Sequence, residues 1–214
     1  PFGAAREIDL GFARVWAIRR SFLGELGYEL LIPAEFTAHV YESLLAAGAP
    51  RGLRHAGMFA LGACRLEKGF RHFGHDIGEE DTPYETGLGF AVRLDKGGFV
   101  GRAALARQKA EQGAATHHRT VSLRLNAASA EAGPYLIHNE PVWKDGALVG
   151  HVTSGGWGWR LGAMVGLATL HRDGGVTRAW IEEGGFTVQI AGAFHPATLQ
   201  LGPLYDPAGE RMRG

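Results

Sequence analysis

The sequence predicts an α+β protein in which a mixed α/β region precedes a small antiparallel β-barrel. Up to about residue 115, strand-like runs alternate with segments of helical spacing, whereas short strand-like runs follow one another from His117 onward. Glycine supplies 33 of 214 residues, twice its usual share of roughly 7%, and falls in pairs between apolar runs, as in turns of a β-rich protein. We therefore expect two regions, 1–115 and 116–214.

In the first region, strands are expected at 14–20 and 27–33, joined by a turn at 24–27, and Pro33 ends the second strand. Apolar spacing predicts helices at 34–47, 56–68 and 102–112, and alternation predicts a strand at 88–94. The acidic segment 76–85 is typical of a loop.

In the second region, the pattern predicts strands at 120–125, 142–144, 148–153, 163–170, 178–182 and 186–190. Their short, regular spacing suits an all-β barrel or sandwich, of which we expect the barrel. The segment 126–135 is expected to be a long loop.

Composition and charge exclude several classes of function. Lys+Arg and Asp+Glu number 22 each, so no global field attracts nucleic acid or an anionic membrane. No apolar run approaches the roughly 18 residues that a membrane-spanning helix needs. The single Cys64 leaves no internal disulfide and fits a reducing compartment, so we expect a cytoplasmic location.

The turn at 24–27 is the first candidate for a binding site. Glycines at 24 and 27 permit a tight backbone beside Glu25, and that carboxylate can accept two parallel N–H bonds from a flat heterocycle such as a pterin. Tyr28 follows directly, where an aromatic ring can stack on such a ligand or pack in the core. The alternative is a β-hairpin whose acidic residue faces water.

Other candidate residues also leave alternatives open. Arg65 is either a cation favoured by the end of its helix or a residue near a ligand. Trp157 and Trp159 lie in an expected glycine-rich loop, where they either pack onto another element, line a ligand channel or face a partner domain.

Metal and nucleotide chemistry have no matching motif. The run His72-Phe-Gly-His75-Asp76 has no cysteine and no clear third ligand, so we expect no metal site. The sequence holds neither a P-loop nor a Gly-x-Gly-x-x-Gly fingerprint, so we expect no flavin, nicotinamide or nucleotide bound by this chain.

Several linked blocks resemble the folate-binding aminomethyltransferase (glycine-cleavage T-protein) family, in the version that forms the C-terminal module of sarcosine and dimethylglycine dehydrogenases. These blocks are SFLGELGYELLIP (21–33), RLEKGFRHFGHDI (65–77), TPYETGLGFAVRLDKGGFVGRAAL (82–105), HVTSGGWGW (151–159) and PLYDPAGERMRG (203–214). The resemblance covers nearly the whole chain. It implies a partial T-protein-like α/β unit with ferredoxin-like elements, followed by the family's C-terminal β-barrel.

The resemblance also implies a function and a set of binding residues. A flavin-containing partner domain or subunit oxidises a sarcosine- or dimethylglycine-type amine, and tetrahydrofolate held by this module accepts the one-carbon unit. Glu25 would fix the pterin edge, Tyr28 would stack on it, and Arg65 and Arg71 would be cations for the glutamyl tail. A third option keeps the folate pocket with a different carbon donor, as in the glycine-cleavage aminomethyltransferase or a sulfonium demethylase.

Two departures from the family pattern limit the expected activity. The family's assisting acidic residue corresponds to a segment before Pro1, so we assign no catalytic residue and expect the isolated chain to lack turnover. Leu61-Gly62 stands where family members often carry Arg-Asp. The alternative function is therefore a non-catalytic structural or docking module that retains the fold without binding folate.

Overall fold

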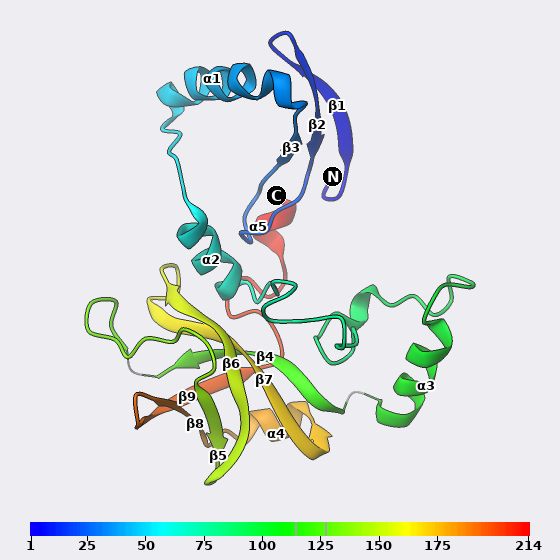
Figure 1. Cartoon of the computed structure of the whole chain (residues 1–214), viewed down its shortest axis with the longest axis vertical. Helices are drawn as coiled ribbons and strands as arrows, with labels where there is room; N and C mark the ends of the chain where they lie inside the picture. Colours follow the sequence, from blue (N-terminus) through cyan, green and yellow to red (C-terminus); the bar gives the residue numbers. More distant parts are fainter. Residues whose placement is uncertain (114, 127) are drawn as a thin grey trace. The chain divides into compact units, whose positions relative to one another are not determined.

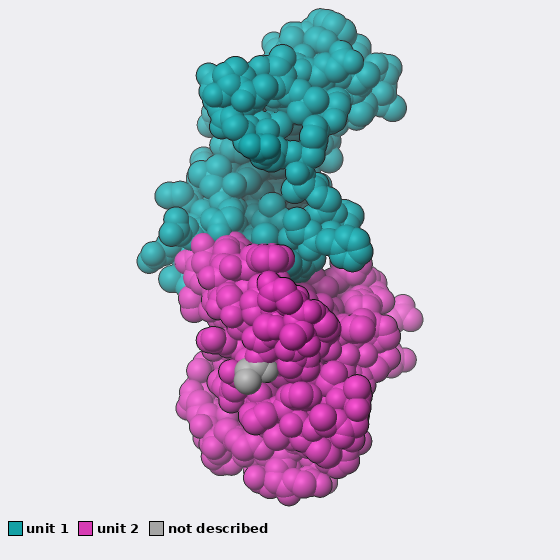
Figure 2. Space-filling model, turned by 90° about the vertical axis from the view of Figure 1, so that its left-hand side faces the viewer, with its two compact units in different colours: residues 1–64, 208–214 teal, residues 65–207 magenta. Residues whose placement is uncertain are grey.

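The structure is a computed structural model that describes residues 1–113, 115–126 and 128–214. The chain divides into two compact units, here called unit 1 (residues 1–64 and 208–214) and unit 2 (residues 65–207), coloured separately in Figure 2. This division falls inside helix α2 (Met58–Glu67), away from the boundary expected near residue 115. The expected regions 1–115 and 116–214 stay a prediction.

Unit 1 contains an antiparallel sheet in the order β1-β2-β3, with helix α1 (Thr37–Gly48) following it in the chain (Figure 1). The strands are β1 (Ala5–Leu10), β2 (Ala13–Ile18) and β3 (Glu29–Leu31). Unit 1 also holds the short elements η1 (Ala34–Phe36), η2 (Ala49–Arg51) and α5 (Glu210–Arg213) and the part of α2 up to Cys64. Ala13 and Val15 of β2 pack against Val40 of α1 in a small buried cluster. This apolar contact holds the helix on the sheet.

Unit 2 is built on a closed antiparallel barrel whose strands run in the order β4-β7-β6-β5-β8-β9. These strands are β4 (Thr116–Leu125), β5 (Pro141–Lys144), β6 (Ala147–Gly158), β7 (Ala163–Val176), β8 (Phe186–Ile190) and β9 (Ala193–Gln200). Leu123, Val152 and Leu170 are fully buried members of its apolar core. The predicted α+β class and the predicted barrel are therefore confirmed.

Close backbone approach explains glycines inside the long barrel strands. A Cβ on Gly150 would lie 2.1 Å from the carbonyl oxygen of Thr169, and a Cβ on Gly155 would lie 2.2 Å from the Cβ of Leu136. A side chain at either position would displace a neighbouring segment. The glycine run of β6 thus lets that strand lie against β7 and the segment before β5.

The helices expected at 34–47, 56–68 and 102–112 are present as η1 with α1, as α2, and as α3 (Arg102–Gln112). Strands β1 and β9 were not expected. The expected strand 88–94 is wrong, because only a short 3-10 turn, η3 (Gly89–Ala91), lies there. Residue 127 of the expected loop 126–135 lies outside the described residues.

The segment 178–182 was expected to be a strand, and it is helix α4 (Arg178–Glu182) instead. Thr177 precedes the helix and its hydroxyl accepts a hydrogen bond from the backbone N–H of Trp180 at 3.2 Å. This N-cap satisfies a backbone donor that helix formation leaves free. The cap, together with burial of Trp180 and Ile181, fixes the helix.

None of the helices in the described part of the chain is both long enough and apolar enough to cross a bilayer.

Candidate functional site

The glycine turn of unit 1 is a fixed irregular segment. Residues 22–26 form bends between β2 and β3, and Gly24 has a φ of +79° that favours glycine. Ser21 accepts a hydrogen bond through its hydroxyl from the N–H of Leu23 at 3.1 Å, and Arg19 donates to the carbonyl of Gly27 at 3.3 Å. The first contact is local to the start of the turn, and the second ties the end of the turn to the residue that follows β2.

A cavity of about 550 Å³ opens beside this turn. Its lining consists of Arg20, Ser21, Phe22, Leu23, Gly27, Tyr28, Glu29 and Leu61. Glu25 is half-buried and does not itself line the cavity, although Leu23 and Gly27 on either side of it do. The predicted carboxylate therefore neighbours residues of the cavity wall in the sequence, but it is not part of that wall.

Tyr28 belongs to two cavities. It lines the one just described and a second of about 570 Å³ along the sheet, where Leu30 and Leu44 supply apolar walls. Tyr28 is 64% exposed, and the Arg19 guanidinium lies 5.4 Å from its ring centroid. An exposed aromatic face beside a cation suits contact with a flat ligand more than a core position.

Arg20 and Glu29 form an ion pair in the wall of the first cavity. The hydrogen bond from Arg20 lowers the pKa of Glu29, and the same bond raises the pKa of Arg20. Both side chains are about half exposed, so the pair adds little to stability. Its consequence is a cavity wall that carries charge of both signs.

Arg65 of unit 2 lies in a buried polar network centred on Asp76. Its Nη1 donates to the Asp76 Oδ2 at 2.6 Å and to the carbonyl of Phe70 at 3.2 Å. Its Nη2 donates to the Ser154 hydroxyl at 2.9 Å. These contacts join the end of α2 to strand β6 of the barrel.

The Asp76 carboxylate accepts from both sides. Its Oδ2 also accepts from the backbone N–H of His72 at 2.8 Å, while its Oδ1 accepts from the hydroxyls of Thr153 at 2.7 Å and Ser154 at 2.6 Å. Neighbouring strand residues ordinarily point to opposite faces, but the β6–β7 register shifts between Val152 and Ser154. This irregularity allows two successive hydroxyls to reach one carboxylate.

Glu67 and Lys68, from the same sequence block, make further buried ion pairs that the sequence did not predict. Glu67 pairs with Arg160 and accepts from the backbone N–H of Leu161 at 3.2 Å, while Lys68 pairs with Asp206 at 2.7 Å. The sequence could have indicated these pairs through the charged block Arg65-Leu-Glu-Lys68 at the end of an apolar helix. Charged residues in such a position are buried only when they are paired.

Arg71 follows this block and lies beside a second cation, Arg119 of β4. Its Nη1 donates to the carbonyl of Gly69 at 2.5 Å. Burial, and then the charge of Arg119, lower the pKa of Arg71 to about 10, and Asp76 offsets this in part. Arg71 therefore keeps its charge at neutral pH in a site that disfavours it.

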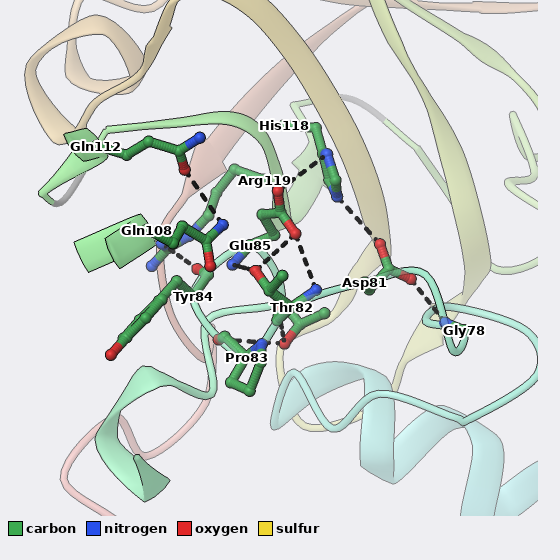
Figure 3. A network of polar contacts seen from close by, with 11 residues as sticks. Gly78, Asp81, Thr82, Pro83, Tyr84, Glu85, Gln108, Gln112, His118 and Arg119 are labelled. Carbon is green, nitrogen blue, oxygen red and sulfur yellow. Dashed lines mark hydrogen bonds and ion pairs between the residues drawn. The ribbon is translucent and has the colours of Figure 1, made fainter. Parts of the chain in front are cut away.

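A polar network fixes the segment that leads to Arg119 (Figure 3). Figure 3 shows His118 between two carboxylates: its Nε2 lies 3.1 Å from Asp81 Oδ1 and its Nδ1 lies 3.6 Å from Glu85 Oε1. Glu85 also accepts from the Thr82 hydroxyl at 2.6 Å. These bonds attach the segment 78–88 to the start of β4.

Trp157 does not lie in the glycine-rich loop that the sequence predicted. Strand β6 continues to Gly158, so Trp157 lies in a strand rather than in a glycine-rich loop, and it packs partly against the barrel core. Trp159 follows the strand and is 73% exposed. Within the described ranges, no group of three or more His, Cys, Asp or Glu residues has metal-binding geometry.

The structure distributes the predicted site residues over both units. Glu25 and Tyr28 lie on one turn of unit 1, whereas Arg65, Arg71, Trp157 and Trp159 belong to unit 2.

Comparison with a solved structure identifies the fold. The fold is that of a glycine-cleavage aminomethyltransferase: the crystal structure of aminomethyltransferase T from Bartonella henselae matches with a TM-score of 0.79 at 23% identity, over 96% of this chain and 53% of that one. The family models then match by sequence, the GCVT N-terminal domain over residues 1–96 and the glycine cleavage T-protein C-terminal barrel domain over residues 118–206. The chain belongs to the glycine-cleavage T-protein family.

Relatives among characterised proteins are considerably longer. The chain is 42% identical over 98% of its length to 4-methylaminobutanoate oxidase (formaldehyde-forming) of Paenarthrobacter nicotinovorans, and 32% identical over 100% of its length to human mitochondrial sarcosine dehydrogenase. An aminomethyltransferase of Halothermothrix orenii is 35% identical over 75% of this chain and 43% of its own length. The chain spans 24% and 23% of the first two relatives.

Proposed function

We propose that this chain is a tetrahydrofolate-binding module for one-carbon transfer. The match of both T-protein family models along the chain carries this proposal. The proposal is supported by the position of the Glu25 carboxylate, on a glycine turn beside a cavity of about 550 Å³. This volume is within the usual range for small-molecule sites.

The residues of the turn fit a reduced pterin chemically. Glu25 offers two acceptor oxygens to the parallel N–H groups of an amino-pyrimidine edge, and such charge-assisted pairs are strong and directional. Tyr28 offers an exposed ring for stacking, a contact of about 0.5–1.5 kcal/mol beyond burial. Glu25 has to turn toward the cavity when the ligand enters, because it does not line the cavity in this structure.

The proposed source of the carbon is an oxidised N-methyl amine. Two relatives are named as an oxidase of 4-methylaminobutanoate and a dehydrogenase of sarcosine, and both names denote oxidation of an N-methyl amine. A flavin-containing oxidoreductase domain or subunit is the proposed partner. The formaldehyde-forming relative suggests a second fate for the carbon, in which it leaves without capture by folate.

Arg65 and Arg71 remain proposed folate-binding residues, with unequal support. The guanidinium of Arg65 is committed to Asp76, Ser154 and Phe70, which favours a supporting role. Arg71 makes no ion pair with any described residue, which favours it as a cation for glutamyl carboxylates. The exposed Trp159 is the proposed partner contact, and the cytoplasmic location stays a prediction.

Titration calorimetry with tetrahydrofolate under anaerobic conditions tests the proposal. We expect binding by the wild-type chain and an affinity lower by at least about tenfold in Glu25→Gln, since that variant keeps the shape and loses the charge. Glu35→Gln, an exposed change in the same unit, is the matched control and should bind as wild type. Equal affinities for all three proteins would contradict the role of Glu25.

The second candidate is a structural or docking module without folate binding. Leu61-Gly62 favours it, as does 31% identity over 93% of this chain to the mitochondrial pyruvate dehydrogenase phosphatase regulatory subunit of Mus musculus, a protein named for regulation. A folded wild-type chain that gives no heat with tetrahydrofolate would favour this candidate over the first.

A further inference from the structure

Two guanidinium groups of unit 2 converge on the backbone of Gly87. A Cβ placed on this glycine would lie 2.8 Å from Nη2 of Arg71 and 3.8 Å from Nη2 of Arg119. Gly87 has a φ of +75°, a conformation that favours glycine and leaves this space without a side chain. The two cationic ends therefore share one small space next to a backbone turn.

The protein does not neutralise these cations. Each guanidinium gives one Nη1 to a carbonyl, Arg71 to Gly69 at 2.5 Å and Arg119 to Tyr84 at 2.6 Å. Across the described residues, neither arginine forms an ion pair, and the Nε of each is buried without a hydrogen-bond partner. Asp76, the acidic residue that acts on Arg71, already accepts four hydrogen bonds from other groups.

Two like charges in partly buried positions raise the free energy of the folded state unless an anion joins them. The lowered pKa values of Arg71 and Arg119 have burial as their largest cause, and the charge of Arg119 adds to the effect at Arg71. A guanidinium matches the geometry of carboxylate and phosphate through paired N–H donors. An oxyanion would thus supply the missing charge and acceptors together.

We propose that Arg71 and Arg119 form an oxyanion-binding site beside Gly87, suited to a carboxylate or a phosphate group. For a glutamyl ligand the site rests on the proposed function, which already assigns Arg71 to glutamyl carboxylates, and it deepens that function by adding Arg119, which the sequence did not suggest. Glutamyl carboxylates and free phosphate are two sources of the same ligand chemistry.

The surroundings of Arg119 hold it in position before any ligand arrives. Its neighbour His118 contacts Asp81 and Glu85, and the next residue, Thr120, donates its N–H to the carbonyl of Glu85 at 2.9 Å. Figure 3 shows His118, Asp81 and Glu85 together with Arg119. A cation on such a fixed segment loses little conformational entropy when it binds an anion.

Calorimetry at constant ionic strength tests this site, with inorganic phosphate and the dipeptide γ-glutamylglutamate as separate probes. We expect wild type to bind at least one probe, and Arg71→Gln and Arg119→Gln each to weaken that binding by at least about tenfold. Arg71→Lys, which keeps the charge and loses the planar fork, should bind between wild type and Arg71→Gln. Arg107→Gln, on the exposed face of α3, is the control and should bind as wild type.

The possible results distinguish a phosphate ligand from a glutamyl ligand, and they test the anion site separately from folate binding. Binding of phosphate alone identifies a free phosphate site, and binding of the dipeptide identifies a glutamyl carboxylate site. No binding of either probe by wild type, or equal binding by wild type and both glutamine variants, would overturn the site. If a glutamine variant does not fold, Arg71→Lys decides the matter, because it keeps the charge and should still bind more weakly than wild type. No folate is used, so this result is independent of the folate proposal.

Discussion

Neutralising Asp76 should destabilise unit 2 more than any exposed charge change. The Asp76 side chain is fully buried and Arg65 is 10% exposed, so the pair is shielded from solvent. In Asp76→Asn the amide can turn its NH₂ toward the hydroxyls of Thr153 and Ser154 and its oxygen toward Arg65. The two hydroxyls, which donate to Asp76, then accept instead, so both contacts persist in the reverse direction and the main loss is the charge that compensates Arg65.

Breaking a buried pair by removing one charge costs about 3–5 kcal/mol. We place Asp76→Asn near the lower end, about 3 kcal/mol, because its hydrogen bonds are retained. Asp76→Ala also removes an acceptor from four donors, so its loss of unfolding free energy should lie near the upper end, about 5 kcal/mol.

Urea denaturation followed by far-UV circular dichroism gives the free energy of unfolding for each variant. Asp173→Asn, an exposed change in β7 of the same unit, is the control and should stay within about 0.5 kcal/mol of wild type. If Asp76→Asn were as stable as this control, the network would not hold α2 to the barrel as described.

Three other outcomes are expected. Gly155→Ala should lose about 1–3 kcal/mol of stability by denaturation, because its Cβ would collide with Leu136, whereas Gly98→Ala has open space and should change little. Burial, then His118 and His151, lower the pKa of His171 from 6.5, so the unfolded chain binds more protons below that pH and stability falls with acidity. His171→Gln should flatten this dependence between about pH 5 and about pH 7.5, and an unchanged slope would refute the assignment. The isolated chain should form methylenetetrahydrofolate no faster than the uncatalysed reaction of formaldehyde with tetrahydrofolate, and a faster rate in a coupled absorbance assay would overturn that expectation.

Local pattern was enough to predict most of the barrel. Alternating apolar residues at 120–125 and 186–190 lie in β4 and β8, because such strands bury one face in the core. The same reasoning gave a wrong strand at 178–182, because this short apolar run has no clear period. The N-cap at Thr177 favours a helix there instead. The threonine was visible in the sequence and could have corrected the prediction.

The buried charge network could not be derived from local pattern. Arg65 and Ser154 are separated by 89 positions in the sequence. Their contact depends on a register shift in β6 that the residue types there do not predict. The Arg71–Arg119 pair likewise arises only when β4 is placed beside the segment around Gly87. The glycine turn was found from sequence because all its residues are contiguous.

The proposed function of this chain depends most directly on where a reduced folate binds. A crystal structure of the chain soaked with a stable reduced folate, such as 5-formyltetrahydrofolate, measures this. We predict the pterin in the cavity beside residues 20–29, with its amino-pyrimidine edge on the Glu25 carboxylate and its ring against Tyr28. A pterin bound elsewhere, or a bound pterin that the Glu25 carboxylate does not contact, would contradict the proposed function.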